Sequence, residues 1–403
     1  MRWPNHGPLT KRITASGRLN PSHWGIYLAY LARDRRPIHP MRTTRLVVTL
    51  IVLSSTLIAG VEDQAFFFEI EPRSSTLPAA PSATGAVVVG NLNGRGGFYW
   101  MPTTGVIDIG GILATGVSSD GRTIVGTAAD TRGVRNAAIW QRGAEWRLLG
   151  GFRNGVPCDT SLSDAAGVSR DGKVLVGAAR IDCRAVHAFR WEESTGMVDL
   201  GSTVAGASSQ ALAVSGNGKV VVGWQRRADG SDFGVRWVDG RQESFASPEG
   251  PVGHALASNL DGSVIVGRQC RPGARVEDQS AWIWLASRGV KCLPPPALRQ
   301  SPGTVLMYAN AVSDHARVVG GGQKATSSSD SEAVVWIDGA PSYLKDYLRV
   351  HGVPNAFERW INTGEITGVS QDGRILVGYG TAIGGSRGYV AVLKRMEPKP
   401  WPD

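Results

Sequence analysis

Arginine is the residue with the most obvious potential for chemistry in this chain of 403 residues, because it recurs in the segments between short apolar runs. A guanidinium group binds a carboxylate or sulfate through two parallel hydrogen bonds. The candidate ligand-binding arginines are Arg135, Arg180, Arg184, Arg226, Arg227, Arg268 and Arg271. Acidic residues such as Asp182, Asp229 and Asp232 occur in the same segments. The arginines therefore form either a rim for an anionic ligand or a solvated rim held by local ion pairs.

Catalytic and metal-binding motifs are absent from the sequence. There is no Gly-x-Ser-x-Gly, no glycine-rich strand-to-helix loop, no Cys-x-x-Cys and no His-x-x-x-His. We therefore assign no catalytic residue, no metal ligand, no cofactor and no role to the histidines. Two carboxylates brought together from distant segments would suffice for a glycosidase or lyase. A carbohydrate-active enzyme remains the alternative function.

The first sixty residues have the layout of an export signal. Arg42 and Arg45 precede an apolar stretch from Leu46 to Ala59, and small residues follow it. This stretch is shorter than the ~20 residues of a membrane span. We expect residues 41–60 to be a cleaved signal peptide, with an uncleaved anchor or a buried helix as alternatives. Residues 1–40 are then a mis-assigned start or disordered. The mature protein would be periplasmic or extracellular, with no transmembrane segment.

Export places the four cysteines in an oxidising compartment. Cys158 and Cys183 flank one predicted hairpin, while Cys270 and Cys292 fall within one repeat unit. Two disulfides, Cys158–Cys183 and Cys270–Cys292, are the pairing that we expect among three possible ones.

The charge of the chain is misleading. Its net charge of +9 comes almost wholly from residues 1–60, which carry nine basic residues and one acid, so that the remainder has a net charge of only +1. Binding to nucleic acid through phosphate neutralisation needs a basic footprint. We expect no nucleic-acid partner, and we expect a monomer.

A repeat organises the rest of the sequence. Seven apolar segments end in glycine between Gly90 and Gly378, with a mean spacing of about 48 residues. A tryptophan follows six of the seven segments at the corresponding place, and Ala391 replaces it in the seventh. These tryptophans, expected to pack between repeat units, are Trp100, Trp140, Trp191, Trp237, Trp284 and Trp336.

Each unit contains four short strands. Asp-Gly and Asn-Gly pairs such as Asp171-Gly172 mark tight hairpin turns. The second strand is apolar at consecutive positions, which is typical of a strand covered on both faces. Four-stranded antiparallel units that cover one another form a β-propeller. We predict an all-β fold, a seven-bladed β-propeller, with a short helical insert near 342–352.

The last unit lacks a fourth strand. The β-prone run 66–70 belongs to no unit, and we predict that it completes the last blade and closes the ring; the alternative is a loose linker after the signal. The propeller domain would span 62–394, followed by a Pro-rich tail at 395–403.

The two faces of the predicted propeller differ in the length of their loops. The connections between the second and third strands of a blade, and those from one blade to the next, would form one face, here called the long-loop face. The tight turns would form the opposite face, here called the tight-turn face. Ligands bind preferentially to long loops on a rigid scaffold.

The repeat unit, with its pattern A-x-x-VS-x-DG-x-x-VVG followed by AF-x-W and GM-x-DLG, resembles the HAF-type extracellular repeat of secreted bacterial proteins. The resemblance covers roughly 80–393. It implies secretion and a propeller-like β fold, and it implies no reaction. His315, at the place of the turn glycine, and Ala391 depart from the pattern.

We therefore expect a secreted binding or surface module with an unknown glycan or protein ligand on its long-loop face. A purely structural repeat in a surface layer is a third possibility, which predicts neither pocket nor ligand.

Overall fold

The computed structural model describes residues 64–70, 75–152, 161–270, 280–296, 305–325 and 331–395. All of them belong to the unit Val48–Asp403. The expected signal peptide at 41–60, the segment 1–40 and residues 396–403 of the tail lie outside the described residues, and so do Cys158 and Arg271.

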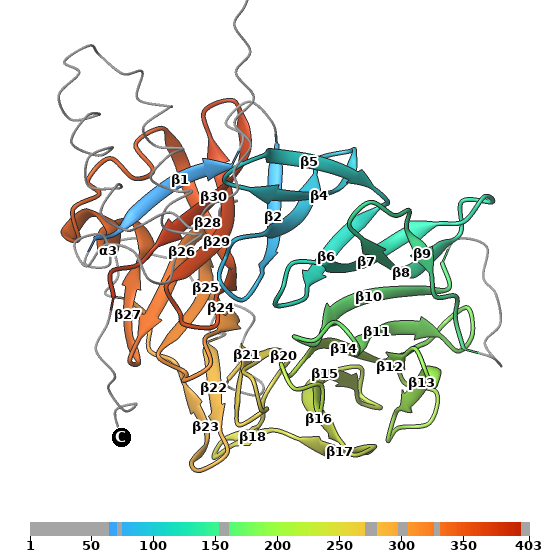
Figure 1. Ribbon diagram of the computed structural model, residues 1–403. Coiled ribbons are helices and arrows are strands. Elements are labelled where there is room, and N and C mark those ends of the chain that lie inside the picture. The colour runs from blue at the N-terminus through green and yellow to red at the C-terminus, as the bar shows by residue number, and fades with distance from the viewer. Residues whose placement is uncertain are drawn as a thin grey trace, which may run out of the picture. The chain divides into compact units, whose positions relative to one another are not determined.

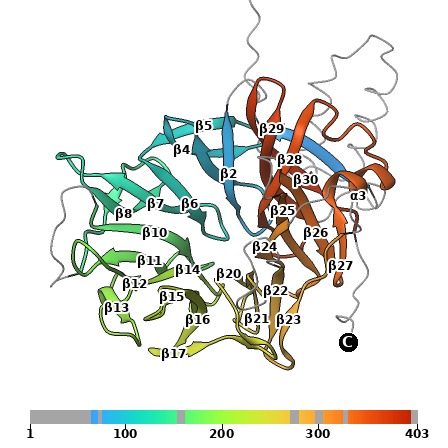
Figure 2. The same cartoon turned by 180° about the vertical axis from the view of Figure 1, so that it is seen from behind.

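The described residues form seven four-stranded antiparallel blades, here called blades 1 to 7 in chain order; blades 5 and 6 are joined in one eight-stranded sheet. Figures 1 and 2 show these sheets arranged around a common centre. Blade 1 consists of β2 (Thr76–Pro81), β3 (Val88–Leu92), β4 (Gly96–Met101) and β5 (Gly105–Gly110), and blade 2 of β6 (Leu113–Val117), β7 (Thr123–Ala129), β8 (Arg135–Gln141) and β9 (Arg147–Leu148). Blade 3 consists of β10 (Ser163–Val168), β11 (Leu175–Arg180), β12 (Val186–Glu192) and β13 (Gly196–Gly201), and blade 4 of β14 (Ser209–Val214), β15 (Val220–Arg226), β16 (Asp232–Val238) and β17 (Arg241–Ser244). Blade 5 consists of β20 (Ala255–Ser258), β21 (Val264–Arg268), β22 (Ala281–Leu285) and β23 (Gly289–Cys292), and blade 6 of β24 (Val305–Val312), β25 (Val318–Ala325), β26 (Ser331–Ile337) and β27 (Ala340–Tyr343). Blade 7 consists of β28 (Trp360–Val369), β29 (Ile375–Ala382), β30 (Gly385–Val392) and β1 (Phe66–Ile70). The fold is the predicted seven-bladed β-propeller.

The first strand of each blade is the innermost. These strands contact one another in an unbroken ring, in the order β2, β6, β10, β14, β20, β24, β28 and back to β2. They therefore form the wall of a central channel. Blades 5 and 6 are also joined by a single residue pair, Arg268 with Tyr308.

The turn between the first and second strands explains the Ser-x-Asp-Gly motif. In blade 2 the Asp120 carboxylate accepts hydrogen bonds from the Ser118 hydroxyl (2.6 Å) and the Arg122 amide (3.0 Å). Gly121 has a φ of 71°, in the left-handed region that favours glycine. The turn is thus fixed by its own side chains.

Tryptophans fill the seams between blades. Trp237 is 2% exposed and packs against Val174 and Val176 of the preceding blade. Trp336 is fully buried against blade 5, and Trp100, Trp140 and Trp191 are buried at three other seams. In blade 5 the fully buried indole is that of Trp282, while Trp284 is half-buried at the same seam.

The strand β1 occupies the fourth position of blade 7, which the sequence analysis assigned to this segment. It lies antiparallel to β30, from Phe66 opposite Val392 to Ile70 opposite Gly388. Phe67 contacts the rings of Phe357 and Tyr389 at centroid distances of 4.4 and 5.8 Å. These aromatic rings fill the seam between blades 6 and 7, where the repeat has no tryptophan.

Three smaller features complete the fold. The helix α3 (Leu344–Val350) lies within the predicted insert and buries Leu344, Tyr347 and Leu348. A two-stranded hairpin, β18 (Ala246–Ser247) and β19 (Gly250–Pro251), leads from blade 4 to blade 5. The predicted Cys270–Cys292 disulfide is present. Cys183 is also disulfide-bonded, but the Cys158–Cys183 pairing stays a prediction because Cys158 lies outside the described residues.

Candidate functional site

The candidate arginines that the structure describes lie at the long-loop ends of their blades. Arg135 begins β8, while Arg180, Arg226 and Arg268 end the second strands of blades 3, 4 and 5. Arg184 and Arg227 lie in the loops that follow. The predicted rim therefore spans four blades.

Several of these arginines already have local partners. The Arg135 Nη2 atom lies 3.0 Å from the Asp164 carboxylate of the next blade. Arg180 donates to the Cys183 carbonyl (3.4 Å), and the Arg227 guanidinium lies over the Phe233 ring, 4.6 Å from its centroid. The rim is thus partly a set of local contacts and does not act as a single site.

The seam between blades 4 and 5 gathers two of the arginines into one network, here called the blade 4/5 cluster (Trp224, Arg226, Asp232, His254 and Arg268). Asp232 accepts from Arg226 Nε at 3.0 Å and lies 3.2 Å from His254 Nε2. Arg268 Nη2 lies 3.0 Å from His254 Nδ1. The Trp224 ring stacks on the imidazole at 5.2 Å, and Arg226 lies over the same indole.

These contacts fix the protonation state of His254. A guanidinium can only donate, so Nδ1 accepts from Arg268 and Nε2–H donates to Asp232. The imidazole is therefore neutral. Burial, reinforced by the positive charge of Arg268, lowers the pKa of His254 to about 4, although Asp232 opposes the shift.

The charges of the blade 4/5 cluster do not balance. Two guanidiniums face one carboxylate and a neutral imidazole, which leaves one positive charge in excess. Arg268 is solvent-exposed and forms no ion pair with any carboxylate in the described part of the chain. Desolvation lowers the pKa of Arg268, and Asp232 partly offsets this effect. An anion that approached Arg268 would relieve an electrostatic cost that the described residues leave uncompensated.

A second polar cluster lies between blades 6 and 7. The Glu365 carboxylate accepts from the Tyr379 hydroxyl (2.6 Å) and from Asn310 Nδ2 (3.0 Å). Burial and the negative charge of Glu365 raise the pKa of Tyr308 and Tyr379 above the ordinary range of a phenol. Both hydroxyls therefore stay protonated and act as donors.

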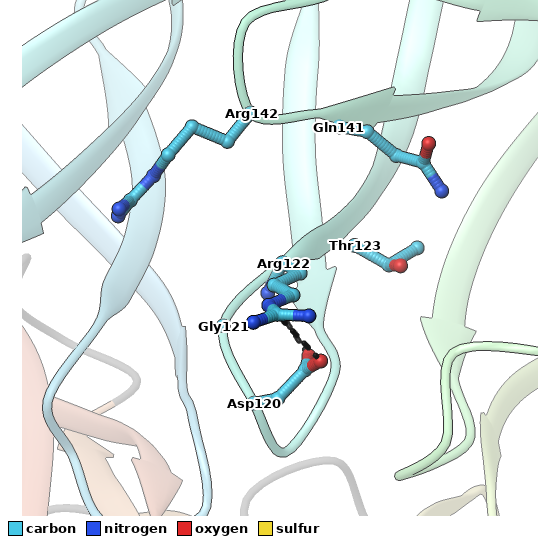
Figure 3. Close-up of a pocket in the computed structure, with 6 residues that line it drawn as sticks. All are labelled: Asp120, Gly121, Arg122, Thr123, Gln141 and Arg142. Carbon is cyan, nitrogen blue, oxygen red and sulfur yellow. Dashed lines mark hydrogen bonds and ion pairs between the residues drawn. The ribbon is translucent and has the colours of Figure 1, made fainter.

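The tight-turn face carries an open groove of about 580 Å³ at blade 2. Figure 3 shows Gln141 and Arg142 pointing to opposite sides above the Asp120–Arg122 ion pair. That pair is long, at 3.8 Å, and both side chains are more than half exposed. Exposed pairs of this kind contribute little to stability. The groove also has two arginines and one carboxylate, but no histidine links its charged groups into a network as His254 does in the blade 4/5 cluster.

Among the described residues, no group of three or more His, Cys, Asp or Glu side chains could hold a metal ion. Within the same residues, no helix has the length and apolar character needed to cross a membrane.

Arg226 and Arg268 were both predicted to be rim residues, but the sequence did not predict that one network would contain them both. His254 received no role, although its contacts connect Arg268 to Asp232. The residues of this network come from the ends of β15 and β21, the start of β16 and the loop before β20. Arg226 and Arg268 end the second strands of neighbouring blades, but Asp232 and His254 lie in segments that vary between units, so the repeat gave no signal that these residues meet.

The sequence matches no family model and no curated protein. Solved structures with a similar fold do exist. The β-propeller domain of the trilobed protease from Pyrococcus furiosus, described as having an open velcro topology, aligns over 82% of this chain and 98% of its own, with 14% identity and a TM-score of 0.51. TolB from Acinetobacter baumannii aligns over 67% of this chain and 64% of its own (13% identity, TM-score 0.43). An oligogalacturonate lyase in complex with manganese aligns over 82% and 96% (11% identity, TM-score 0.49). At these identities the similarity concerns the β-propeller fold alone.

Proposed function

We propose that this β-propeller is an exported binding module that recognises an anionic ligand, such as an acidic glycan or an acidic protein segment, on its long-loop face. The excess positive charge of the blade 4/5 cluster carries the proposal. Arg268 is exposed, held by a fixed imidazole and unpaired with any described carboxylate. Hydrogen bonds between charged groups contribute roughly 1.5–3 kcal/mol each.

Export is supported by two observations. The Cys270–Cys292 disulfide is characteristic of an oxidising compartment. The repeat resembles the HAF-type extracellular family, and we propose membership of that family on the basis of the repeat motif. Mass spectrometry of the amino terminus of the native protein, after cell fractionation, tests both the signal cleavage and the compartment.

Ligand binding is tested on an array of uronate-bearing, sulfated and neutral oligosaccharides at low and high salt. We expect Arg268→Gln to weaken binding of the acidic ligands about tenfold or more, and we expect salt to weaken it in the unmodified protein. Arg142→Gln on the tight-turn face is the matched control and should bind normally. Binding that ignores salt, or that survives Arg268→Gln unchanged, would contradict the proposal.

A carbohydrate-active enzyme is the second candidate, and the Glu365 cluster favours it. Glu332 accepts a short hydrogen bond from Thr363, two residues before Glu365, so two carboxylates occur at the seam between blades 6 and 7. Paired carboxylates are the groups that glycoside hydrolysis requires. Turnover of an acidic oligosaccharide that Glu365→Gln abolishes would favour this alternative over simple binding.

A further inference from the structure

The tight-turn end of the central channel carries a closed belt of hydrogen bonds. In six of the blades, the belt residue is the one that follows the serine of the turn between the first and second strands. In blade 5 the belt residue is Asn259, which stands where the other blades have this serine. The belt bonds are Ala83 N to Ser119 O (3.3 Å), Ser119 N to Arg170 O (2.9 Å), Arg170 N to Gly216 O (2.9 Å), Gly216 N to Asn259 O (3.2 Å), Asn259 Nδ2 to Asp314 O (3.0 Å), Asp314 N to Gln371 O (3.0 Å) and Gln371 N to Ala83 O (3.2 Å). The backbone amide of Asn259 bonds within its own hairpin, and its side chain replaces it in the belt.

Two side-chain contacts cross the space inside this belt. Arg170 of blade 3 forms an ion pair with Asp314 of blade 6. Gln371 Nε2 of blade 7 donates to Ser119 Oγ of blade 2 at 2.8 Å. The Arg170–Asp314 pair joins blades on opposite sides of the ring and therefore spans the channel, whereas the Gln371–Ser119 contact passes blade 1 on the inside of the belt. We call these four side chains the channel plug.

The neighbouring blade leaves room for the plug. A Cβ atom on Gly216 would lie 2.5 Å from Arg170 Nε and 2.7 Å from its Cδ. The arginine therefore reaches across the channel over a residue without a side chain. Its side chain and that of Asp314 are only 25% and 17% exposed.

Behind the plug, the channel wall is a ring with one residue from the end of each first strand. The ring consists of Pro81, Val117, Val168, Val214, Ser258, Val312 and Val369, six of them apolar. The ring and three of the plug residues, Ser119, Arg170 and Gln371, line a half-open cavity of about 160 Å³ to which all seven blades contribute.

We infer that the plug closes the channel at the tight-turn face, so that a bulky solute does not enter the channel from that side. The inference goes beyond the proposed function and does not depend on the identity of the ligand.

A thiol reporter tests the closure. Ser258 belongs to the apolar ring, and its hydroxyl makes only a 3.5 Å contact with the Asn259 carbonyl. Ser258→Cys therefore places a nearly isosteric thiol behind the plug. The rate of reaction with a bulky maleimide is compared in the intact protein and after Arg170→Ala. We expect the rate to rise at least about fivefold when the plug is removed, and we expect the exposed reporter Ser194→Cys to react at the same rate in both.

Hydrogen exchange of the same proteins tests the contact across the channel. Arg170→Ala should accelerate exchange in the turn that contains Asp314, 144 residues away in sequence. Arg122→Ala, which removes an exposed arginine paired only within its own turn, should leave the blade 6 turn unchanged. If Arg170→Ala fails to fold, Asp314→Asn, which preserves the shape of the side chain, takes its place.

An unchanged Ser258→Cys rate in a plug variant whose blade 3 and blade 6 turns exchange faster would overturn the inference. This result does not depend on ligand binding, so failure of this inference is distinct from failure of the proposed function.

Discussion

His254 is a neutral, buried imidazole whose two nitrogens both have partners, and this makes it a reporter of the blade 4/5 cluster. Its pKa of about 4 lies below the 6.5 of an exposed histidine. Protonation would place a third positive group beside Arg226 and Arg268. The folded state therefore resists protonation, whereas the unfolded chain accepts the proton readily.

The linkage has a definite sign. Because the folded pKa is the lower one, the stabilising contribution of the neutral histidine is complete above pH 6.5 and is lost as the pH falls toward 4. We expect the free energy of unfolding to fall by about 2–3 kcal/mol between pH 7.5 and 4.5 from this group. Urea titrations at several pH values measure it.

The His254→Gln variant is the control for this prediction. It cannot titrate, so it should lose this part of the pH dependence while other groups contribute as before. Equal pH dependence in both proteins would mean that His254 is already protonated or exposed in the folded state.

Among the secondary-structure elements, strands and turns were predictable from the sequence, whereas the clusters were not. The glycine after each apolar run, the Asp-Gly turns and the phased tryptophans recur in every unit or nearly so, and local physical chemistry gives each of them one role. Trp237 and Trp336 are buried at seams for this reason. In blade 5, however, the sequence Ala281-Trp282-Ile283-Trp284 offers two indoles on the same face of β22. Trp282 packs over Gly267 and donates to the Arg268 carbonyl, and it is buried more deeply than the expected Trp284.

The contacts at the candidate site follow a different rule. Asp232 and His254 lie in segments that differ from unit to unit, so the repeat carries no information about them. Their meeting depends on the register between blades, which only the packed ring determines. The same holds for Arg170 and Asp314, which occupy an ordinary variable turn position in their own units.

The disulfide Cys270–Cys292 links the end of β21 to β23 and encloses a segment of 22 residues. Closing a loop of this size lowers the entropy of the unfolded chain and stabilises the fold by roughly 3 kcal/mol. We expect the double variant Cys270→Ser/Cys292→Ser to unfold at a lower temperature by calorimetry. A reducing agent should lower the melting temperature of the unmodified protein but add little to the effect of the double variant at this site. An unchanged melting temperature would show that blade 5 is held by packing alone.

The whole ring is closed by an element from the opposite end of the domain. The strand β1 pairs with β30 and buries Phe67 among Phe357, Trp360 and Tyr389. Trp360 also donates to the Glu69 carboxylate at 2.9 Å. Without β1, the edge of β30 would expose unpaired backbone groups that favour aggregation.

We expect deletion of 64–70 to lower the unfolding midpoint and to promote aggregation, measured by calorimetry and light scattering. A synthetic peptide with the sequence of 63–70 should restore part of the stability, because the vacant strand position can accept it. Substituting Ile383, which is 72% exposed, with Ala is the control and should change stability by less than about 0.5 kcal/mol. A deletion variant as stable as the intact protein would mean that the channel belt alone keeps the ring closed.

The position of β1 also determines when the molecule can finish folding. Its first pairing, Phe66 with Val392, joins residues at opposite ends of the domain, and such distant contacts form slowly because a very long loop must close first. Six blades can assemble from neighbouring hairpins, but the seventh has to wait until β30 has been synthesised. A partly synthesised chain would therefore remain an open arc with a free edge, and completion of the circle would be the slow, late step of its folding.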